Sequence, residues 1–269
     1  MSDRIHLSIA DGIADVRLNR PDKMNALDPE MFIAIAEAGA RIRQDATVRV
    51  VVLSGEGRAF CAGMDLDRII GTTRGDSILP FPDLTRRTHG VANFPQHIIW
   101  LWRELAVPVI AAVHGAAFGG GLQLALGADL RYVAPGTKLS ILEAKWGLVP
   151  DMAGTQLMRH LVREDIVREL AYTARVFSAE EALAYGFATR LEADPLAAAM
   201  ATAREIAARS PDAIRAIKRL LTAAVSSDAA AGLAMETAEQ SKLLGSPNQI
   251  EAVLANLENR PANFADPHA

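Results

Sequence analysis

Two apolar segments of the chain each run directly into a glycine-rich turn. The segments are VRVVVLSG at 48–55 and VPVIAAVHG at 107–115. Nearly continuous runs of β-branched and other apolar residues are typical of strands buried on both faces of a parallel sheet. The turns lead into the helix starts FCAGMDL and FGGGLQLAL. Strands that alternate with helices in this way predict an α/β fold, in which helices cover the faces of the sheet.

The rest of the chain predicts further elements of one α/β layer, followed by helices. Alternating apolar and polar residues flank Asp11 and Gly12, which predicts a β-hairpin with these two residues as its turn. Beyond Thr155 the pattern becomes helical, with helices expected at 155–174, 178–186, 194–210 and 211–225. We also expect helices at 31–45 after an Asp28-Pro29 start, at 94–105 and at 247–259, short strands at 130–134 and 138–142, and an irregular segment at 71–93.

Composition narrows the class of protein. The chain has 269 residues, of which 50% are hydrophobic, so it can build one large domain with a sizeable core. Its formal net charge of -4 argues against a nucleic-acid-binding surface over the whole molecule. No stretch reaches the roughly 18 consecutive apolar residues of a membrane span. Cys61 is the only cysteine, which excludes an internal disulfide and suits a cytoplasmic location.

The three consecutive glycines at 119–121 suit a place where a ligand approaches bare backbone. A dinucleotide-binding fingerprint and a phosphate-binding P-loop both need other residues around such glycines, and neither pattern is present. The first N–H groups of a helix have no partner within it, so they can bind an oxygen that becomes negatively charged. Tight packing of strand and helix would explain the glycines equally well. The second glycine turn, at Gly63, favours the functional interpretation, because donors from two such turns would form an oxyanion hole.

Six segments, in a fixed order along the chain, point to a known family. They are LNRPDKMNAL, GRAFCAGMDL, PVIAAVHGAAFGGGLQLALGADLRY, EAKWGLVPDMAGTQ, SAEEALAYGFATRL and IEAVLANLENRPANF. Together they resemble the crotonase superfamily, the enoyl-CoA hydratase/isomerase family. The resemblance implies a crotonase-like ββα spiral core, which we place at 1–200, and a C-terminal helical trimerisation region at 201–269. It also implies a homotrimer or a dimer of trimers.

The resemblance further implies the ligand. The substrate is expected to be an acyl-CoA thioester, and coenzyme A enters only as part of that substrate, without a permanently bound cofactor. Neither nucleic acid nor a membrane is expected as a partner. The histidines at 89, 97 and 160 lie far apart in the sequence and are not expected to form a metal site. His114 is expected to make a structural hydrogen bond, and Cys61 to behave as a small buried apolar residue.

The resemblance assigns the two backbone donors of an oxyanion hole to Met64 and Gly120. These N–H groups would stabilise the enolate oxygen that forms when a proton leaves the α-carbon of the thioester. The resemblance also implies substrate-binding roles for Lys23, Met24, Ala26, Leu27, Ala62, Asp65, Leu66 and Gly119. Lys23 could bind phosphate together with Arg58, or it could be a solvated surface cation. Asp65 could equally be a helix N-cap.

Three polar residues are candidates for the proton-transfer chemistry. Hydratases of the family use two glutamates, and the second of them is present here as Glu143. The first is replaced by Gln123, whose amide can orient water but cannot exchange a proton at neutral pH. Asp151 matches an aspartate that dienoyl-CoA isomerases of the family carry. Without the resemblance, Glu143 would be a solvated loop acid and Asp151 a cap of the following helix.

These candidates predict an enzyme that shifts a double bond in an unsaturated acyl-CoA. Glu143 would be the main acid and base and Asp151 its assistant, while the 71–93 segment and the helix after it shape the acyl pocket. One alternative is hydration of a 2-enoyl-CoA by Glu143, with Gln123 orienting the water. Another alternative is an acyl-CoA-binding protein that has no catalytic activity.

Overall fold

The two buried strands that the sequence indicates lie side by side in the middle of the main sheet. In the computed structural model, which describes residues 3–77 and 83–267, these are β3 (Val50–Gly55) and β4 (Val109–Val113). They pair in parallel in a six-stranded sheet of order β1-β2-β3-β4-β6-β9. The other strands are β1 (Ile5–Ala10), β2 (Ile13–Leu18), β6 (Leu130–Val133) and β9 (Arg190–Leu191). Among these strands β1 alone runs antiparallel to its neighbour, and its hairpin with β2 turns at Asp11 and Gly12 as predicted.

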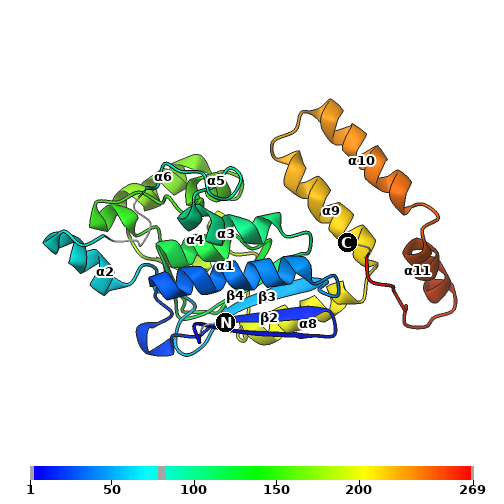
Figure 1. Cartoon of the computed structure of the whole chain (residues 1–269), viewed down its shortest axis with the longest axis horizontal. Coiled ribbons are helices and arrows are strands. Elements are labelled where there is room, and N and C mark those ends of the chain that lie inside the picture. Colours follow the sequence, from blue (N-terminus) through cyan, green and yellow to red (C-terminus); the bar gives the residue numbers. More distant parts are fainter. Residues whose placement is uncertain (1–2, 78–82, 268–269) are drawn as a thin grey trace.

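Helices cover both faces of the sheet, as the apolar strands require. Val51 and Leu53 belong to the main core, which also contains apolar residues of α1 (Pro29–Gln44) and α3 (Phe94–Glu104). Val50 and Val52 face the other way, onto Ala199 and Ala203 of α8 (Pro195–Ala207). Figure 1 shows α1 and α8 on opposite sides of the sheet. The alternation of side chains along one strand therefore fills two cores.

The start of α1 confirms the capping signal at Asp28 and Pro29, and α3 begins with a second cap. The side chain of Asp28 accepts a hydrogen bond from Met31 N at 2.8 Å, and Pro29 occupies the first turn of α1. Asn93 and Gln96 form a reciprocal capping box at the start of α3, which matches the helix expected at 94–105. A proline in the first turn, as in α1 and α3, costs no helical hydrogen bond, because an N–H group at that position has no acceptor within the helix.

A second, three-stranded sheet lies beside the first and supports the glycine-rich turn. Its order is β5-β7-β8, formed by β5 (Ala116–Phe118), β7 (Lys138–Ser140) and β8 (Phe177–Ser178). The strand β5 was not predicted, because its three residues leave no room for an alternating pattern. The buried helix α4 (Gly120–Leu126) starts directly after it and packs against α5 (Gly154–Met158).

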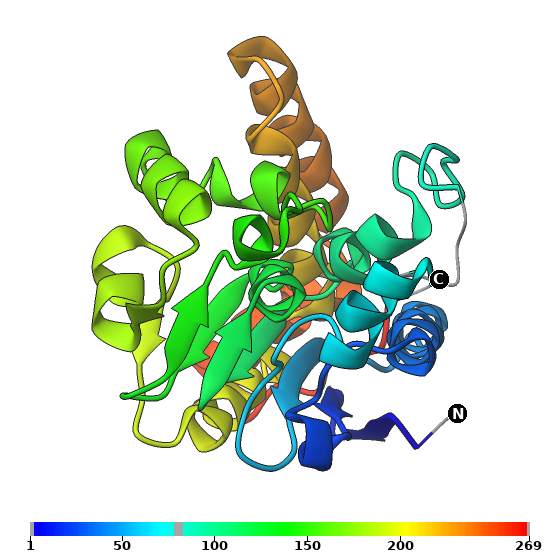
Figure 2. The ribbon, with the colours of Figure 1, turned by 90° about the vertical axis from the view of Figure 1, so that its left-hand side faces the viewer.

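The C-terminal part is helical, but its elements differ in detail from the predicted ones. The segment predicted as one helix after Thr155 is divided into α5 and α6 (Glu164–Thr173), and two short strands interrupt the helical region. Further helices are α7 (Ala179–Tyr185), α9 (Pro211–Ala224), α10 (Ala229–Leu243) and α11 (Pro247–Leu257), of which α10 was not predicted. The boundary expected at residue 200 falls within α8. Figure 1 shows α10 apart from the sheet, and in Figure 2 the orange helices of this region extend above the rest of the ribbon.

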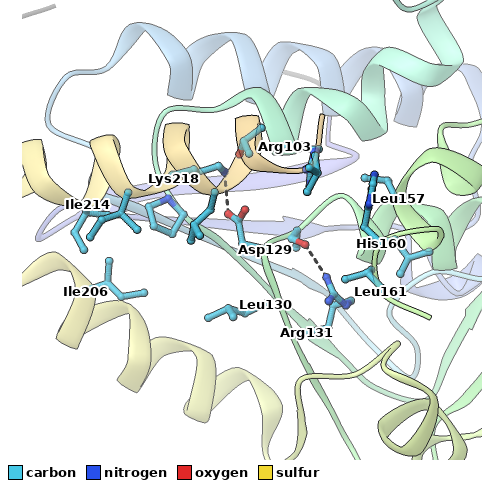
Figure 3. A pocket seen from close by; sticks show the side chains of 17 residues that line it. Arg103, Asp129, Leu130, Arg131, Leu157, His160, Leu161, Ile206, Ile214 and Lys218 are labelled. Atoms are coloured by element: carbon cyan, nitrogen blue, oxygen red, sulfur yellow. Dashed lines mark hydrogen bonds and ion pairs between the residues drawn. The ribbon is translucent and has the colours of Figure 1, made fainter. Parts of the chain in front are cut away.

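A buried lysine fastens α9 to the core. Lys218 donates hydrogen bonds from Nζ to Val107 O at 2.8 Å and Trp102 O at 3.1 Å, and it forms an ion pair with Asp129 at 2.8 Å. Burial lowers the pKa of Lys218, and the charge of Asp129 opposes this change. Figure 3 shows this pair in the wall of a cavity of about 420 Å³ between α9 and the core. Within the described residues, no helix is long and apolar enough to cross a membrane.

One glycine of the triplet is required by packing alone, which gives a testable prediction. A Cβ on Gly121 would lie 2.2 Å from Cys61 O, a backbone atom that cannot move aside. We expect Gly121→Ala to lower the free energy of unfolding by about 3 kcal/mol. A Cβ on Gly232, within α10, would meet open space, so Gly232→Ala should raise it by about 0.5–1 kcal/mol. Chemical denaturation of both variants tests this difference, and equal effects would contradict the role of Gly121.

Candidate active site

The segment Cys61–Asp65 passes between a loop and a strand and is bonded to both. On one side Ala62 N donates to Met24 O at 2.9 Å, and Leu27 N donates to Gly63 O at 2.8 Å. On the other side Cys61 N donates to the carbonyl of β5 at Ala116, at 3.1 Å. The predicted binding loop and the two predicted donor segments are therefore neighbours in the fold.

The backbone bonds around Met64 decide the direction of its own N–H group. Leu27 bonds to the residues on either side of Met64, through Gly63 O at 2.8 Å and Asp65 N at 3.1 Å. Since backbone groups alternate in direction along an extended chain, the N–H of Met64 faces away from Leu27, toward β5 and α4. A Cβ placed on Gly63 would lie 3.5 Å from Gly120 N, so the two turns are in contact.

Gly119 and Gly120 have different reasons to lack a side chain. Gly119 has φ +49° and ψ −120°, a conformation in which other residues are strained, and a Cβ there would lie 3.2 Å from Glu143 Oε1. Its N–H donates to Ser140 O at 2.9 Å. Gly120 is the first residue of α4, so its N–H has no acceptor within the helix. Of the two, Gly120 is the donor that is available to a ligand.

These residues surround a cavity of about 80 Å³. Seven residues of the predicted site line it: Ala62, Met64, Gly119, Gly120, Gln123, Glu143 and Asp151. The lining residues that were not predicted are Gly63, Ile69, Phe118, Leu142, Trp146, Leu148, Val149 and Met152. Several of these belong to the loop GLVPDMAG, whose apolar residues beside a candidate acid were the available signal.

Glu143 is buried at the start of a short 3-10 helix, Glu143–Trp146. Burial raises the pKa of its carboxyl group, and the nearby charge of Asp151 adds to this effect. A hydrogen bond from Gln123 Nε2 to Glu143 Oε1, at 2.6 Å, acts in the opposite direction. The second oxygen, Oε2, is buried and has no hydrogen-bond partner within the described part of the chain. Glu143 is therefore not the solvated loop acid that its local sequence would allow.

Asp151 lies in the turn that precedes α5. The residue as a whole is exposed, but it lines the cavity, and partial burial there raises the pKa of its carboxyl group. It does not cap the following helix, because α5 has Ala153 at its N-cap and no side-chain cap bond. Two residues whose carboxyl groups have a raised pKa thus line one small cavity, an arrangement suited to proton transfer.

Gln123 lies one turn into α4 and is 3% exposed. Its Oε1 accepts hydrogen bonds from Met152 N at 3.0 Å and Gly154 N at 2.8 Å, while its Nε2 donates to Glu143. The amide oxygen is thus occupied by two backbone donors, and only the second N–H of Nε2 remains for a water molecule or a ligand.

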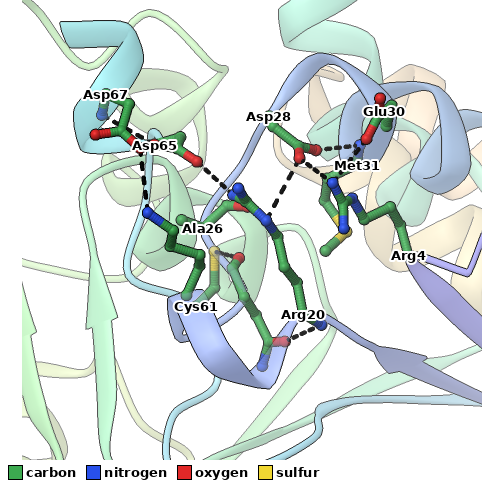
Figure 4. A network of polar contacts seen from close by, with 11 residues as sticks. Arg4, Arg20, Ala26, Asp28, Glu30, Met31, Cys61, Asp65 and Asp67 are labelled. Carbon is green, nitrogen blue, oxygen red and sulfur yellow. Dashed lines mark hydrogen bonds and ion pairs between the residues drawn. The ribbon is translucent and has the colours of Figure 1, made fainter. Parts of the chain in front are cut away.

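The remaining predicted binding residues lie outside the cavity lining. They are Lys23, Met24, Ala26, Leu27, Asp65 and Leu66. The carboxyl group of Asp65 accepts from Asp67 N at 2.9 Å as the N-cap of α2 (Leu66–Gly71). It also pairs with Arg20, which lies between Asp65 and Asp28 in Figure 4. Lys23 forms an exposed ion pair with Asp67 at 3.1 Å. These polar contacts tie the predicted binding loop to the start of α2.

Other residues singled out in the sequence lie away from this cavity. The described residues of the 71–93 segment and of α3, which were expected to shape the acyl pocket, do not line this cavity; residues 78–82 lie outside the described chain. His89 and His97 are not far apart, because their rings stack with centroids 3.9 Å apart, and burial lowers the pKa of His97 to about 4. No group of three metal-ligating side chains occurs in residues 3–77 and 83–267.

Two smaller expectations also have outcomes. Cys61 is buried, and burial raises the pKa of its thiol to about 12, so it is an inert packing residue as expected. The ring of His114 hydrogen-bonds through Nε2 to the carbonyl of Gly57 at 2.9 Å, which is the structural role that was predicted.

Comparisons with known proteins point to one family. A family model described as "Enoyl-CoA hydratase/isomerase" matches residues 8–267. The chain is 34% identical over 265 residues to "Probable enoyl-CoA hydratase echA6" of Mycobacterium tuberculosis, covering 97% of this chain and 98% of that protein. It is 32% identical over 259 residues to the human mitochondrial "Delta(3,5)-Delta(2,4)-dienoyl-CoA isomerase", covering 92% and 77%. An enoyl-CoA hydratase structure from Bacillus anthracis superposes with a TM-score of 0.86 at 28% identity, covering 98% of this chain and 100% of that one.

Proposed function

This chain belongs to the enoyl-CoA hydratase/isomerase family, and we propose that it shifts a double bond in an unsaturated acyl-CoA thioester. The observation that carries the proposal is the pair of carboxyl groups, Glu143 and Asp151, beside one cavity. The amide of Gln123, which lines the same cavity, is already bonded to backbone. Relatives include proteins named as hydratases and one named as an isomerase. The choice of reaction therefore depends on the chemistry of this site.

The proposed reaction is a proton shift that balances without a co-reactant. Ionised Glu143 removes a proton from C2 of a 3-enoyl thioester, and the electron pair of the C–H bond moves into the thioester to give a dienolate. The N–H groups of Met64 and Gly120 would stabilise the negative oxygen, an effect worth about 2.7–4 kcal/mol for one such donor. A carboxyl group then returns a proton to C4, so that the double bond moves from C3–C4 to C2–C3. Asp151 is the second group that can serve in this step.

The proposed binding residues are those of the cavity and of the loop beside it. The cavity volume of about 80 Å³ suits the reacting end of the thioester, so the remainder of the acyl-CoA would lie along the loop of Met24 and Leu27. Lys23, Ala26, Ala62, Asp65, Leu66 and Gly119 remain proposed contacts of that ligand. Coenzyme A takes part only as a portion of the substrate.

Hydration of a 2-enoyl-CoA is the second candidate function. It is favoured by the names of several relatives, and it would use Glu143 as the acid and base. In this reaction only the second N–H of Gln123 Nε2 would be left to orient the water, because the amide oxygen already accepts two backbone hydrogen bonds. An acyl-CoA-binding protein without catalysis is a third alternative. The raised pKa that burial gives to Glu143 argues against it, because a binding site has no need of a protonatable buried acid.

A panel of thioesters separates these functions. We expect a 3-enoyl-CoA incubated in deuterium oxide to give the 2-enoyl isomer with deuterium at C4, as measured by mass spectrometry and NMR. Crotonyl-CoA should keep its conjugated absorbance, because no water is added. Loss of that absorbance would identify a hydratase. Tight binding of butyryl-CoA with no exchange at C2 would identify a binding protein.

The proposed assembly is a homotrimer or a dimer of trimers, acting in the cytoplasm. Its support is the helix α10, which buries none of its own residues and packs on α9. The exposed large apolar side chains of this region include Leu221, Leu233, Leu244 and Leu257. Exposed leucines on α9, α10 and the residues around α11 would be covered at an interface between copies of the chain.

A further inference from the structure

The side-chain amide of Gln123 is buried and bonded at both of its ends. Its oxygen accepts from Met152 N and Gly154 N, at 3.0 and 2.8 Å, and its nitrogen donates to Glu143 Oε1 at 2.6 Å. The two backbone N–H groups can only donate, so the amide oxygen must face them. The amide nitrogen must then face Glu143, and this orientation does not depend on the state of the carboxyl group.

The fixed amide makes the two oxygens of Glu143 different. Oε1 accepts the hydrogen bond from Gln123, so a proton carried by the carboxyl group belongs on Oε2. Oε2 is buried and unpartnered among the residues that the structure describes, while Glu143 as a whole is 8% exposed. A buried oxygen without a partner is costly in a protein interior, unless a ligand or a proton completes it.

The same amide also holds the turn that carries Asp151. Met152 and Gly154 flank Ala153, which has φ +68°, a left-handed conformation that costs a non-glycine residue free energy. The two bonds to Gln123 Oε1 offset this cost and close the turn against α4. One side chain therefore restrains both the carboxyl group of Glu143 and the backbone next to Asp151.

We propose that Gln123 is the positioning residue of this site, which directs Oε2 of Glu143 to exchange the proton and holds the Asp151 turn beside it. The catalytic consequence rests on the proposed isomerase function, but the effect on Glu143 exists in the resting protein. A glutamine at this position gives Glu143 a donor that never titrates. A carboxyl group in its place would have to share a proton with Glu143 at short distance.

Two substitutions separate the parts of this role. Gln123→Leu removes both the donor to Glu143 and the acceptor for the turn. Gln123→Glu keeps an oxygen acceptor for Met152 N and Gly154 N but replaces the donor by a second acid. Gln156→Leu is the matched control, because Gln156 is an exposed glutamine on the neighbouring helix α5.

The measurement is the titration of the Glu143 carboxyl group without substrate, from infrared difference spectra against the Glu143→Gln variant. Loss of a hydrogen bond to the charged form raises a carboxyl pKa, so Gln123→Leu should raise that of Glu143 by about one unit. Gln123→Glu should give two coupled titration steps while keeping its melting temperature. With a 3-enoyl-CoA, Gln123→Leu should lower kcat by about tenfold or more and change KM by less than about threefold.

Two results would overturn the inference. One is a Glu143 titration that Gln123→Leu and Gln123→Glu leave as unchanged as Gln156→Leu does. The other is a shifted titration with an unchanged kcat. If the wild-type protein turns over no thioester of the panel, the proposed function fails, and the substrate-free titration still decides whether Gln123 controls Glu143. If Gln123→Leu does not fold, Gln123→Glu carries the test alone.

Discussion

Replacing Glu143 with glutamine is expected to lower kcat for double-bond migration by about 10²–10⁴-fold, the range that one general acid or base contributes. The amide of the variant cannot take up a proton, but its oxygen can still accept the hydrogen bond from Gln123 Nε2 that Glu143 Oε1 accepts at 2.6 Å. The cavity should therefore keep its shape. Steady-state kinetics with a 3-enoyl-CoA measures the loss, and calorimetry with butyryl-CoA should show a nearly unchanged Kd.

The control for this prediction is an exposed glutamate on α1. Glu37→Gln makes the same chemical change far from the cavity lining and should leave kcat unaltered. The pH profile gives a second check. Burial raises the pKa of Glu143, so the rise of kcat/KM that marks ionisation of the base should lie at higher pH than for an ordinary glutamate. Comparable activity of Glu143→Gln and the wild-type protein would remove Glu143 from the mechanism.

Replacing Gly120 with proline should lower kcat by about 10²–10³-fold, the usual cost of losing one oxyanion donor. Proline has no N–H, and the first position of a helix is where that loss breaks no helical bond. The observed rate would then report on the donor rather than on α4. Isomerisation of a 3-enoyl-CoA, together with hydrogen exchange at C2 of butyryl-CoA, measures the effect.

Gly120→Ala is the matched control, because alanine keeps the N–H. A Cβ at this position would approach Leu27 Cδ1 at 3.0 Å and Met152 Sδ at 3.1 Å, both of them ends of flexible side chains. The alanine variant should therefore retain most of the activity and report the steric cost that both variants share. If alanine and proline reduce kcat equally, the lost N–H has no role, and the oxyanion hole must be placed elsewhere.

Local sequence patterns were sufficient for the elements that depend on burial and on capping. The strand at 50–53 contains only valine and leucine, so neither of its two faces carries a polar side chain, and both faces are buried. Asp28 caps α1 through a residue three positions away. The helix α10 was not predicted because its apolar residues do not form a stripe along one side of the helix. In agreement with this, none of its residues is buried. Helical spacing of apolar residues arises where one side of a helix packs on the core. Because α10 has no such buried side, its sequence carries no such spacing.

The sequence by itself determined which residue types could serve the site: two acids, one amide and two glycine turns. Only the tertiary structure decided how they combine, since the partners lie far apart along the chain. In the sequence, Gln123 stands where an acid was expected and cannot exchange a proton. The structure shows that its amide oxygen instead accepts hydrogen bonds from the N–H groups of Met152 and Gly154. The sequence position of Asp65 suits a helix N-cap, but only the fold places Arg20 beside its carboxyl group. Hydrogen bonds between distant residues depend on distances of a few tenths of an ångström, and such distances are set by the packing of whole elements.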